Sequence, residues 1–139
     1  MEDIYIFIQV RNDVGDVTML FNNAGICGPL GPCWKMDVSQ VKKTLDVNLL
    51  ASFITVKEFL PAMIQRNKGH IIATCSMAAL VCTGFSAPYS ASKHGLKAFS
   101  NDLREDLRKI GPNLNIFIST VFPAFINTNM IANHNTYPR

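Results

Sequence analysis

Short apolar runs alternate with longer amphipathic stretches along this chain. Residues 17–21, 71–75 and 114–122 are compact apolar runs whose length and composition favour β-strands. Between them, residues 37–66 and 86–110 repeat apolar side chains at the spacing of a helix. The pattern predicts the order strand–helix–strand–helix–strand, which is typical of an α/β domain built on a parallel sheet.

The first predicted helix has recognisable ends. Asp37 is a suitable N-cap residue, and Asn67-Lys68-Gly69 stops the helical pattern. Pro61 lies near the end and should kink or shorten the last turn. One stripe of this helix carries the apolar residues Val41, Leu45, Leu49 and Phe53.

The second helix should begin near Ser86, with Pro88 tolerated in its first turn, and should end at Gly111-Pro112. Its core-facing stripe contains Leu96, Leu103 and Ile110. In the strand that follows, alternation places Ile116, Ile118 and Thr120 on one face. The opening residues 2–12 fit a helix or a strand, and we prefer the helix.

Composition limits the classes of function. The 139 residues suit one domain, and their 13 basic and 10 acidic side chains form no dense basic run, which argues against nucleic-acid binding. No uninterrupted apolar stretch reaches the roughly 18 residues expected of a transmembrane helix. The four cysteines lack the spacing of a zinc site, so we expect no metal, and reduced thiols in a reducing compartment.

The first strand is too apolar to lie comfortably at an open sheet edge. Parallel strands are usually covered by helices on both faces and by neighbours on both sides. Either a segment upstream or a partner is therefore expected to cover residues 17–21.

The most informative spacing is that of Tyr89 and Lys93, which lie four residues apart and share one face of a helix. A phenol titrates near about 10, which is too high for acid–base work at neutral pH. A neighbouring ammonium stabilises the phenolate, and together with a cationic cofactor ring it could lower the pKa of Tyr89. The alternative is an exposed tyrosine beside a solvated lysine.

Three further features have both a chemical and a structural interpretation. Ser76 follows the second strand, where its hydroxyl could bind a carbonyl or alcohol oxygen or form a turn. Asn48 interrupts an apolar stripe, and it either bonds a neighbouring loop or holds a water that links the helix to Lys93. Asn22-Asn23-Ala24-Gly25 suits close approach by a flat ligand or an ordinary turn.

In this order, these residues resemble the short-chain dehydrogenase/reductase family. The resemblance rests on Asn22-Asn23-Ala24-Gly25, Asn48, Ser76 and Tyr89-x-x-x-Lys93, while Pro123 and Thr128 fit the family's cofactor-contacting loop. Segments 15–17, 59–63 and 125–128 are most similar to the 17β-hydroxysteroid and retinol dehydrogenase branch.

The resemblance implies a partial Rossmann-type fold: a doubly wound parallel sheet between two helix layers, without the first βαβ unit. It implies an NAD- or NADP-dependent oxidoreductase that interconverts an alcohol and a ketone or aldehyde on an apolar substrate, such as a steroid, retinoid or lipid.

The family's motif also implies a role for each matching residue. Tyr89 would be the general acid/base, and Lys93 would tune it and bind the nicotinamide ribose. Ser76 would orient the substrate oxygen, and Asn48 would hold a proton-relay water. The implied cofactor contacts are Asn22, Asn23, Ala24, Gly25, Tyr89, Lys93, Pro123, Ile126 and Thr128.

This chain also departs from the family pattern. The glycine-rich phosphate loop and the residue that selects NAD or NADP would precede residue 1, and the substrate-covering segment would follow Thr128. Ala124 replaces a residue that is usually glycine. We therefore expect residues 1–139 to form one partial domain of a longer enzyme or a truncated product, with poor cofactor affinity and turnover by itself.

Two other interpretations stay open: a catalytically silent chain that pairs with an intact homologue, and a reductase of acyl-carrier substrates. Family members commonly dimerise through the two long helices, and Ala91, Gly95 and Ala98 would permit close helix contact, so we expect a homodimer. The branch implies the cytoplasmic side of the cell, including the endoplasmic reticulum or lipid-droplet surface.

Overall fold

A computed structural model describes residue 10, residues 12–13 and residues 15–126. Its strands β1 (Met19–Asn22), β2 (Gly69–Thr74) and β3 (Ile116–Val121) form a parallel sheet in the order β1-β2-β3. The predicted parallel sheet is therefore confirmed. The helix predicted over residues 2–12 lies almost entirely outside the described residues, of which 10, 12 and 13 are helical.

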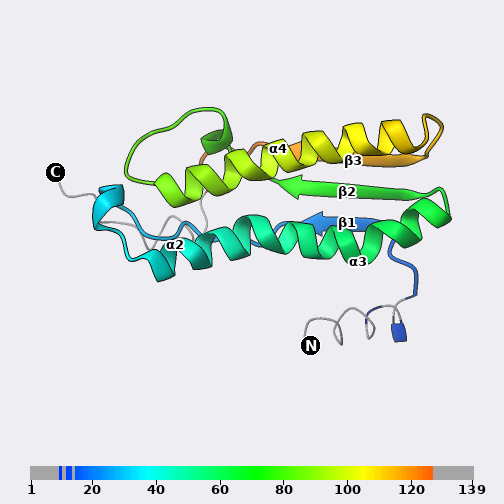
Figure 1. The fold of residues 1–139 in the computed structure, drawn as a ribbon, viewed down its shortest axis with the longest axis horizontal. Coiled ribbons are helices and arrows are strands. Elements are labelled where there is room, and N and C mark those ends of the chain that lie inside the picture. The colour runs from blue at the N-terminus through cyan, green and yellow to red at the C-terminus, as the bar shows by residue number, and fades with distance from the viewer. Residues whose placement is uncertain (1–9, 11, 14, 127–139) are drawn as a thin grey trace.

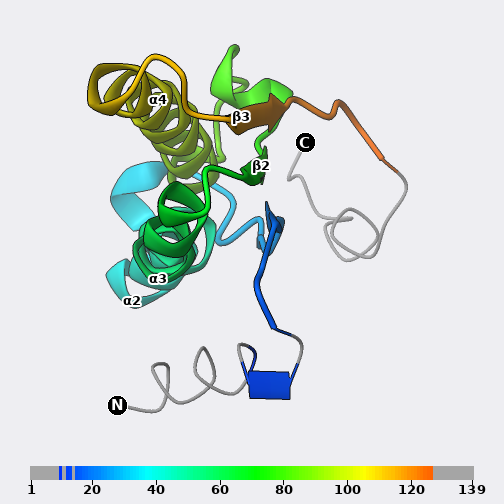
Figure 2. The same ribbon diagram turned by 90° about the vertical axis from the view of Figure 1, so that its right-hand side faces the viewer.

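One long helical segment follows β1, and a second follows β2. The first comprises α2 (Val38–Leu45), a π-helical turn η2 (Asp46–Leu50) and α3 (Ala51–Gln65). The second is α4 (Ala87–Ile110), and short 3-10 turns η1 (Cys33–Lys35) and η3 (Met77–Ala79) precede the two segments. These helices run side by side along the strands (Figure 1). Figure 2 shows them on the same face of the sheet, so the described residues form two of the three expected layers.

The core lies between this face of the sheet and the helices. Leu20, Ile71 and Ile118 are in register across the three strands, and their side chains form an apolar row beneath α3 and α4. The fully or nearly fully buried core residues are Val56, Phe59, Leu60, Met63, Ile71 and Leu107. Ile116 and Ile118 both pack against this cluster, which confirms the predicted face of the third strand.

The π-helical turn changes which side chains the first helix buries. A wider turn holds an extra residue, which rotates every later position relative to a regular α-helix. The predicted stripe therefore fails at its end: Phe53 is 47% exposed, and the core instead contains Val56 and Phe59.

Three other details differ from the sequence prediction. The helix continues past Pro61 to Gln65, close to its predicted end, so Pro61 does not shorten it, because the missing N–H removes only one backbone bond; the alternative of a kink stays a prediction. Ile110 is 67% exposed and Leu107 is buried in its place, since a seven-residue spacing drifts around a helix. Gly95 packs within the chain, where an added Cβ would lie 2.8 Å from Leu49 Cδ2.

The other face of the sheet exposes large apolar side chains in the described part of the chain. Met19 and Phe21 of β1, and Phe117 and Val121 of β3, are all about half exposed or more. β1 and β3 are also the two edges of the described sheet. The expectation that the first strand needs further cover agrees with this geometry.

The segment Val38–Gln65 is long and apolar enough to cross a membrane, judged by length and composition only. Core helices of soluble proteins pass the same test, so the finding is weak support for a membrane span. Val56, Phe59 and Met63 of this segment belong to the core cluster. Packing against the sheet therefore accounts for part of its apolar character, since 28% of the apolar window is buried.

Met63 provides a test of this core. Its side chain has 0% exposure, so Met63→Ala should lower the free energy of unfolding by about 2–5 kcal/mol through lost burial and a residual cavity. Urea denaturation of the two proteins measures the loss. Met77→Ala, at a side chain that is 43% exposed, is the control, and equal losses for the two variants would contradict the assignment.

Candidate active site

The carboxyl ends of the three strands meet at one edge of the sheet. Asn22 is in register with Ala73, and Thr74 with Val121. Beyond the strands, the backbone N–H of Cys75 donates to Val121 O (2.8 Å), and that of Met77 donates to Pro123 O (3.0 Å). Ser76 therefore lies between two backbone bonds that fix its segment beside the loop after β3. Ligands bind at this edge in parallel α/β sheets.

Ser76 and Tyr89 come together at this edge, from the end of β2 and the first turn of α4. The Ser76 hydroxyl lies close enough to the phenol to favour its ionised form. Ser76 Oγ also accepts the Ala78 N–H at 3.1 Å, at the start of η3. In that bond the Ser76 oxygen is the acceptor. The hydroxyl hydrogen of Ser76 therefore remains available for donation to an oxygen atom beside the Tyr89 ring.

Lys93 lies beside Tyr89 but is buried, with 3% exposure. Its Nζ donates to Thr74 O at 2.8 Å and lies 5.7 Å from the centroid of the Tyr89 ring. A backbone carbonyl at the end of β2 therefore holds the ammonium near the phenol. The separation is within the range of a cation–π contact.

Burial dominates the pKa values of this pair. Desolvation raises the pKa of Tyr89, the neighbouring Cys27 and Cys75 thiols add to the increase, and the Ser76 hydroxyl offsets only part of it. Desolvation also lowers the pKa of Lys93. In the chain alone, burial therefore raises the pKa of Tyr89, and the predicted lowering, which also relied on a cationic cofactor ring, stays a prediction.

Asn48 is buried in the π-helical turn, and its side chain bonds a neighbouring loop. Its Oδ1 accepts the Ile26 N–H (2.8 Å), and its Nδ2 donates to Ile26 O (2.8 Å) and to Ser92 Oγ (3.0 Å). These bonds use both amide hydrogens. The structure therefore supports the loop-anchoring alternative, and the proton-relay water stays a prediction.

The loop after β1 extends toward Lys93. An added Cβ on Gly25 would lie 3.5 Å from both Asn48 Oδ1 and Lys93 Nζ, so this backbone passes directly beside them. Asn22 Oδ1 accepts the Thr55 hydroxyl of α3 at 2.8 Å. Its amide thus ties the strand end to a helix. Asn23 and Ala24 are exposed at the same edge.

The loop after β3 contains the remaining predicted cofactor contacts. Pro123 is held beside Ser76 by the bond from Met77 described above. Ile126 is 56% exposed. Thr128 lies outside the described residues.

Several neighbours of the site were not predicted from the sequence. Cys27 is half-buried and Cys75 is buried, and both thiols interact electrostatically with Lys93. Cys75 Sγ also donates to Lys93 O at 3.1 Å. Cys75 could have been predicted as a neighbour of the site, because it directly precedes Ser76 in the sequence. The sequence does not indicate Cys27, because its position near Lys93 depends on the path of the loop after β1.

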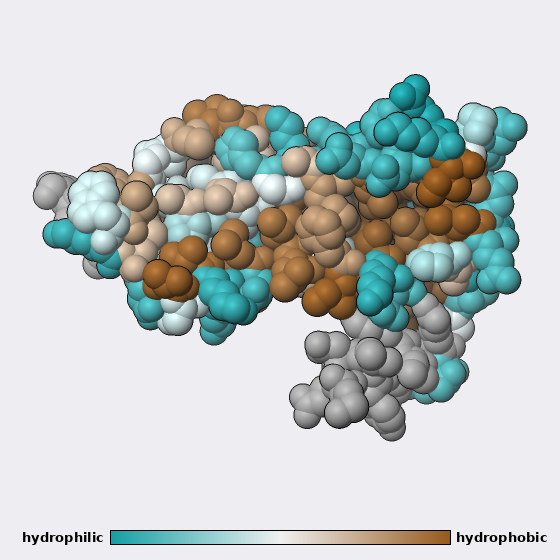
Figure 3. All heavy atoms as spheres, in the orientation of Figure 1, coloured by the Kyte–Doolittle hydropathy of each residue, from teal (hydrophilic) through white to brown (hydrophobic). Residues whose placement is uncertain are grey.

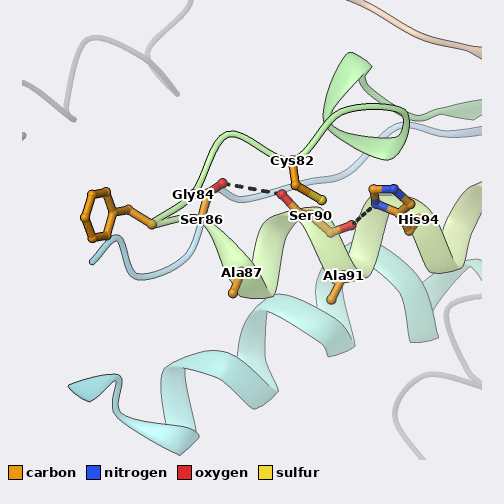
Figure 4. Close-up of a pocket in the computed structure, with 8 residues that line it drawn as sticks. Cys82, Gly84, Ser86, Ala87, Ser90, Ala91 and His94 are labelled. Carbon is orange, nitrogen blue, oxygen red and sulfur yellow. Dashed lines mark hydrogen bonds between the residues drawn. The ribbon is translucent and has the colours of Figure 1, made fainter. Parts of the chain in front are cut away.

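A pocket of about 380 Å³ lies between the first turns of α4 and the loop before it (Figure 4). Its lining is Cys82, Gly84, Phe85, Ser86, Ala87, Ser90, Ala91 and His94, which includes none of the predicted site residues. The His94 ring contacts the Ser90 carbonyl at 2.9 Å, and the Ser86 and Ser90 hydroxyls are 3.4 Å apart. The pocket is therefore separate from the Tyr89 site.

Comparison with known proteins assigns a class to this arrangement. The short chain dehydrogenase family model matches residues 4–138, so the chain belongs to that family. Estradiol 17-beta-dehydrogenase 11 of Rattus norvegicus is 38% identical over 136 residues, which are 97% of this chain and 45% of that protein. The predicted resemblance to 17β-hydroxysteroid dehydrogenases is thus confirmed.

Two further relatives extend the comparison. The 1-deoxy-11-beta-hydroxypentalenate dehydrogenase of Streptomyces exfoliatus is 34% identical over 86% of this chain and 43% of that protein. A short chain dehydrogenase/reductase from Burkholderia phymatum in complex with NAD superposes with a TM-score of 0.83 at 30% identity, over 94% of this chain and 46% of that one. The Rossmann-type fold is confirmed, and the chain spans less than half the length of the curated relatives it matches.

The direction of the Tyr89 shift can be tested on the chain without cofactor. Because the folded state holds the phenolic proton more tightly than the unfolded chain, Tyr89 should titrate above its ordinary value of 10.0. The contribution of this shift to the free energy of unfolding is fully present below the ordinary pKa of tyrosine. It is lost as the pH rises through the pKa of Tyr89 in the folded state. A ¹³Cζ-tyrosine NMR titration, assigned with Tyr89→Phe, measures it.

Ser76→Ala supplies the internal comparison for this titration. It removes the hydroxyl that favours the phenolate, so the pKa of Tyr89 should rise further. A titration of Tyr89 below 10.0 in the unmodified chain would show that burial does not dominate this site.

Proposed function

We propose that the native protein interconverts an alcohol and a ketone or aldehyde on an apolar substrate, with NAD or NADP as cofactor. One observation carries the proposal: the Tyr89 phenol, the Ser76 hydroxyl and the Lys93 ammonium converge at the carboxyl edge of a parallel sheet. The name of the estradiol 17-beta-dehydrogenase relative supports an apolar substrate.

Each of the three side chains has a distinct task in this reaction. In the reducing direction, Tyr89 gives its proton to the substrate oxygen, and in the oxidising direction it takes that proton back. Ser76 donates a hydrogen bond to the same oxygen and holds it at the phenol. Lys93 stabilises the phenolate that remains after proton transfer. The raised pKa of Tyr89 in the chain alone makes the phenol a weaker acid, so proton donation at neutral pH requires positive charge beside it to lower that pKa.

The residues at this edge fit a nicotinamide cofactor. Lys93 has three donor hydrogens, and Thr74 O is its acceptor among the described residues, so the others suit the hydroxyls of a ribose. The glycine at position 25 lets a flat group approach the same ammonium. When bound, the nicotinamide supplies or accepts the hydride at the substrate carbon. Pro123, Ile126 and Thr128 are proposed to contact it from the loop after β3.

Tyr89→Phe tests the proposal in the native protein. Loss of the phenolic proton should lower kcat by about 100- to 10,000-fold and leave KM within a few-fold, since proton transfer occurs only on the way to the transition state. The measurement is oxidation of NADH or NADPH in the presence of apolar ketones and aldehydes. Retention of wild-type kcat by Tyr89→Phe would rule out this mechanism.

Lys93→Met removes the ammonium that stabilises the phenolate, so it should lower kcat. A matched control lies one turn further along α4. Lys97→Met removes a positive charge from the same helix, but Lys97 is less buried than Lys93. A comparable loss of kcat in both variants would indicate a general effect of charge and not a role for Lys93.

We also propose a homodimer through the outer face of α3 and α4. Apolar atoms gather along the middle of this face (Figure 3). Leu50, Phe53 and Ile54 are all more than a third exposed, and the Phe53 ring lies 4.0 Å from that of Phe99 on α4. Ala91 and Ala98 are exposed as predicted, whereas Gly95 already packs against Leu49. This two-helix apolar face supports pairing with a second copy.

Phe53→Glu should weaken this association at least about tenfold, because a charge would be buried at the centre of the face. Size-exclusion chromatography with light scattering, over a dilution series, reports the change. Trp34→Glu alters an aromatic side chain that is 80% exposed in η1 and should leave the assembly intact. Equal assembly of all three proteins would refute this interface.

A second candidate is a catalytically silent chain that pairs with an intact homologue. The exposed Phe53 and Ile54 on the outer face of α3 and α4 favour it, because this face could pair with a homologue as well as with a second copy. The intact mass of the native product distinguishes the two. A mass near 15.4 kDa together with a co-purifying homologue supports the silent chain, and about twice that mass supports the dehydrogenase.

For location, we propose the cytoplasmic side of the cell, including the endoplasmic reticulum or lipid-droplet surface. None of the four cysteines, all of which lie in the described part of the chain, forms a disulfide, which suits a reducing compartment.

A further inference from the structure

We propose that Ser92 is a positioning residue that fixes the turn carrying Tyr89; this inference rests on the function proposed above. Ser92 has 0% exposure and lies between the two catalytic positions of α4. Its Oγ donates to Tyr89 O at 2.7 Å and accepts from Asn48 Nδ2 at 3.0 Å. One hydroxyl thus joins the first turn of α4 to the π-helical turn.

The hydrogen bonds around Ser92 have one consistent direction. Asn48 Oδ1 accepts the Ile26 N–H, and the first hydrogen of Nδ2 is donated to Ile26 O. The second hydrogen of Nδ2 must then point to Ser92, whose own hydrogen is left for the Tyr89 carbonyl. The order Ile26, Asn48, Ser92, Tyr89 therefore links the loop after β1 to the turn that carries the phenol.

This network differs from ordinary hydroxyl bonding inside a helix. Ser100, which is equally buried on the same helix, donates to Leu96 O at 2.8 Å, a bond back to the preceding turn. Ser92 makes a similar local bond but also accepts from a residue 44 positions away. Ser100 therefore provides a control with the same residue type, helix and burial.

The network also lies against Lys93. Gly25 precedes the anchored Ile26, and an added Cβ there would be 3.5 Å from both Asn48 Oδ1 and Lys93 Nζ. A shift of the loop or of the first turn would therefore change the place of the phenol relative to the ammonium. Displacements near 1 Å in such sites can lower the rate by about 100-fold.

The test compares Ser92→Ala with Ser100→Ala in the native protein. Ser92→Ala leaves an Asn48 hydrogen without its acceptor and frees the Tyr89 carbonyl. It should lower kcat by about 10- to 100-fold with KM nearly unchanged, whereas Ser100→Ala should stay within about twofold. Ser92→Thr, which keeps the hydroxyl, should restore most of the activity. Equal kcat per folded molecule for the two alanine variants would overturn the proposal.

A second readout does not require turnover. The ¹³Cζ resonance of Tyr89 and its titration should move in Ser92→Ala and stay in place in Ser100→Ala. If Tyr89→Phe keeps full activity, the proposed function fails, yet this NMR comparison still decides whether Ser92 positions the phenol. An unchanged Tyr89 resonance in Ser92→Ala would reject the positioning role.

Ser92→Cys covers the case in which Ser92→Ala does not fold. The thiol preserves the volume of the side chain but is a weak donor and acceptor, so it should give a smaller change of the same sign. Wild-type kcat and an unmoved Tyr89 resonance in a folded Ser92→Cys protein would count against the proposal.

Discussion

The site depends on the burial of one ammonium group. Lys93 is almost completely removed from water, and a charge in that position destabilises the fold unless polar groups receive it. Thr74 O at the end of β2 is such a group, and it fixes the ammonium at the carboxyl edge of the sheet. The first turn of α4 must then lie over that edge, which brings Tyr89 to Ser76. The same lack of water that strengthens the Lys93 bond raises the pKa of the phenol.

A second constraint is the widened turn in the first long helix. The π-helical turn at Asp46–Leu50 contains Asn48, whose amide reaches the backbone of Ile26 and the hydroxyl of Ser92. Irregular turns of this kind occur often at functional sites. Here the turn joins three segments that are distant in sequence, and it rotates the following helix so that Val56, Phe59 and Met63 face the sheet. One local irregularity therefore affects both the site and the core.

The two apolar surfaces have different relationships to the sheet. The outer face of α3 and α4 is the side of the two helices that faces away from the sheet and the core. On this face the Phe53 and Phe99 rings pack together. The far face of the sheet has no helix layer in the described residues, and its strands β1 and β3 are also edges. Parallel sheets are normally covered on both faces. The first surface therefore suits association of folded copies, while the second suits cover that completes a domain.

The amino-acid sequence by itself determined the parallel α/β order, the helix ends at Asp37 and Gly111, and the pairing of Tyr89 with Lys93, because periodicity and caps are local properties. It also indicated Ser76, since a serine directly after an apolar run falls at a strand end. Only the tertiary structure decided the sign of the Tyr89 pKa shift, the bonds of Asn48 and the place of Cys27 beside Lys93. Those properties depend on burial and on contacts between segments tens of residues apart, which local sequence patterns do not encode.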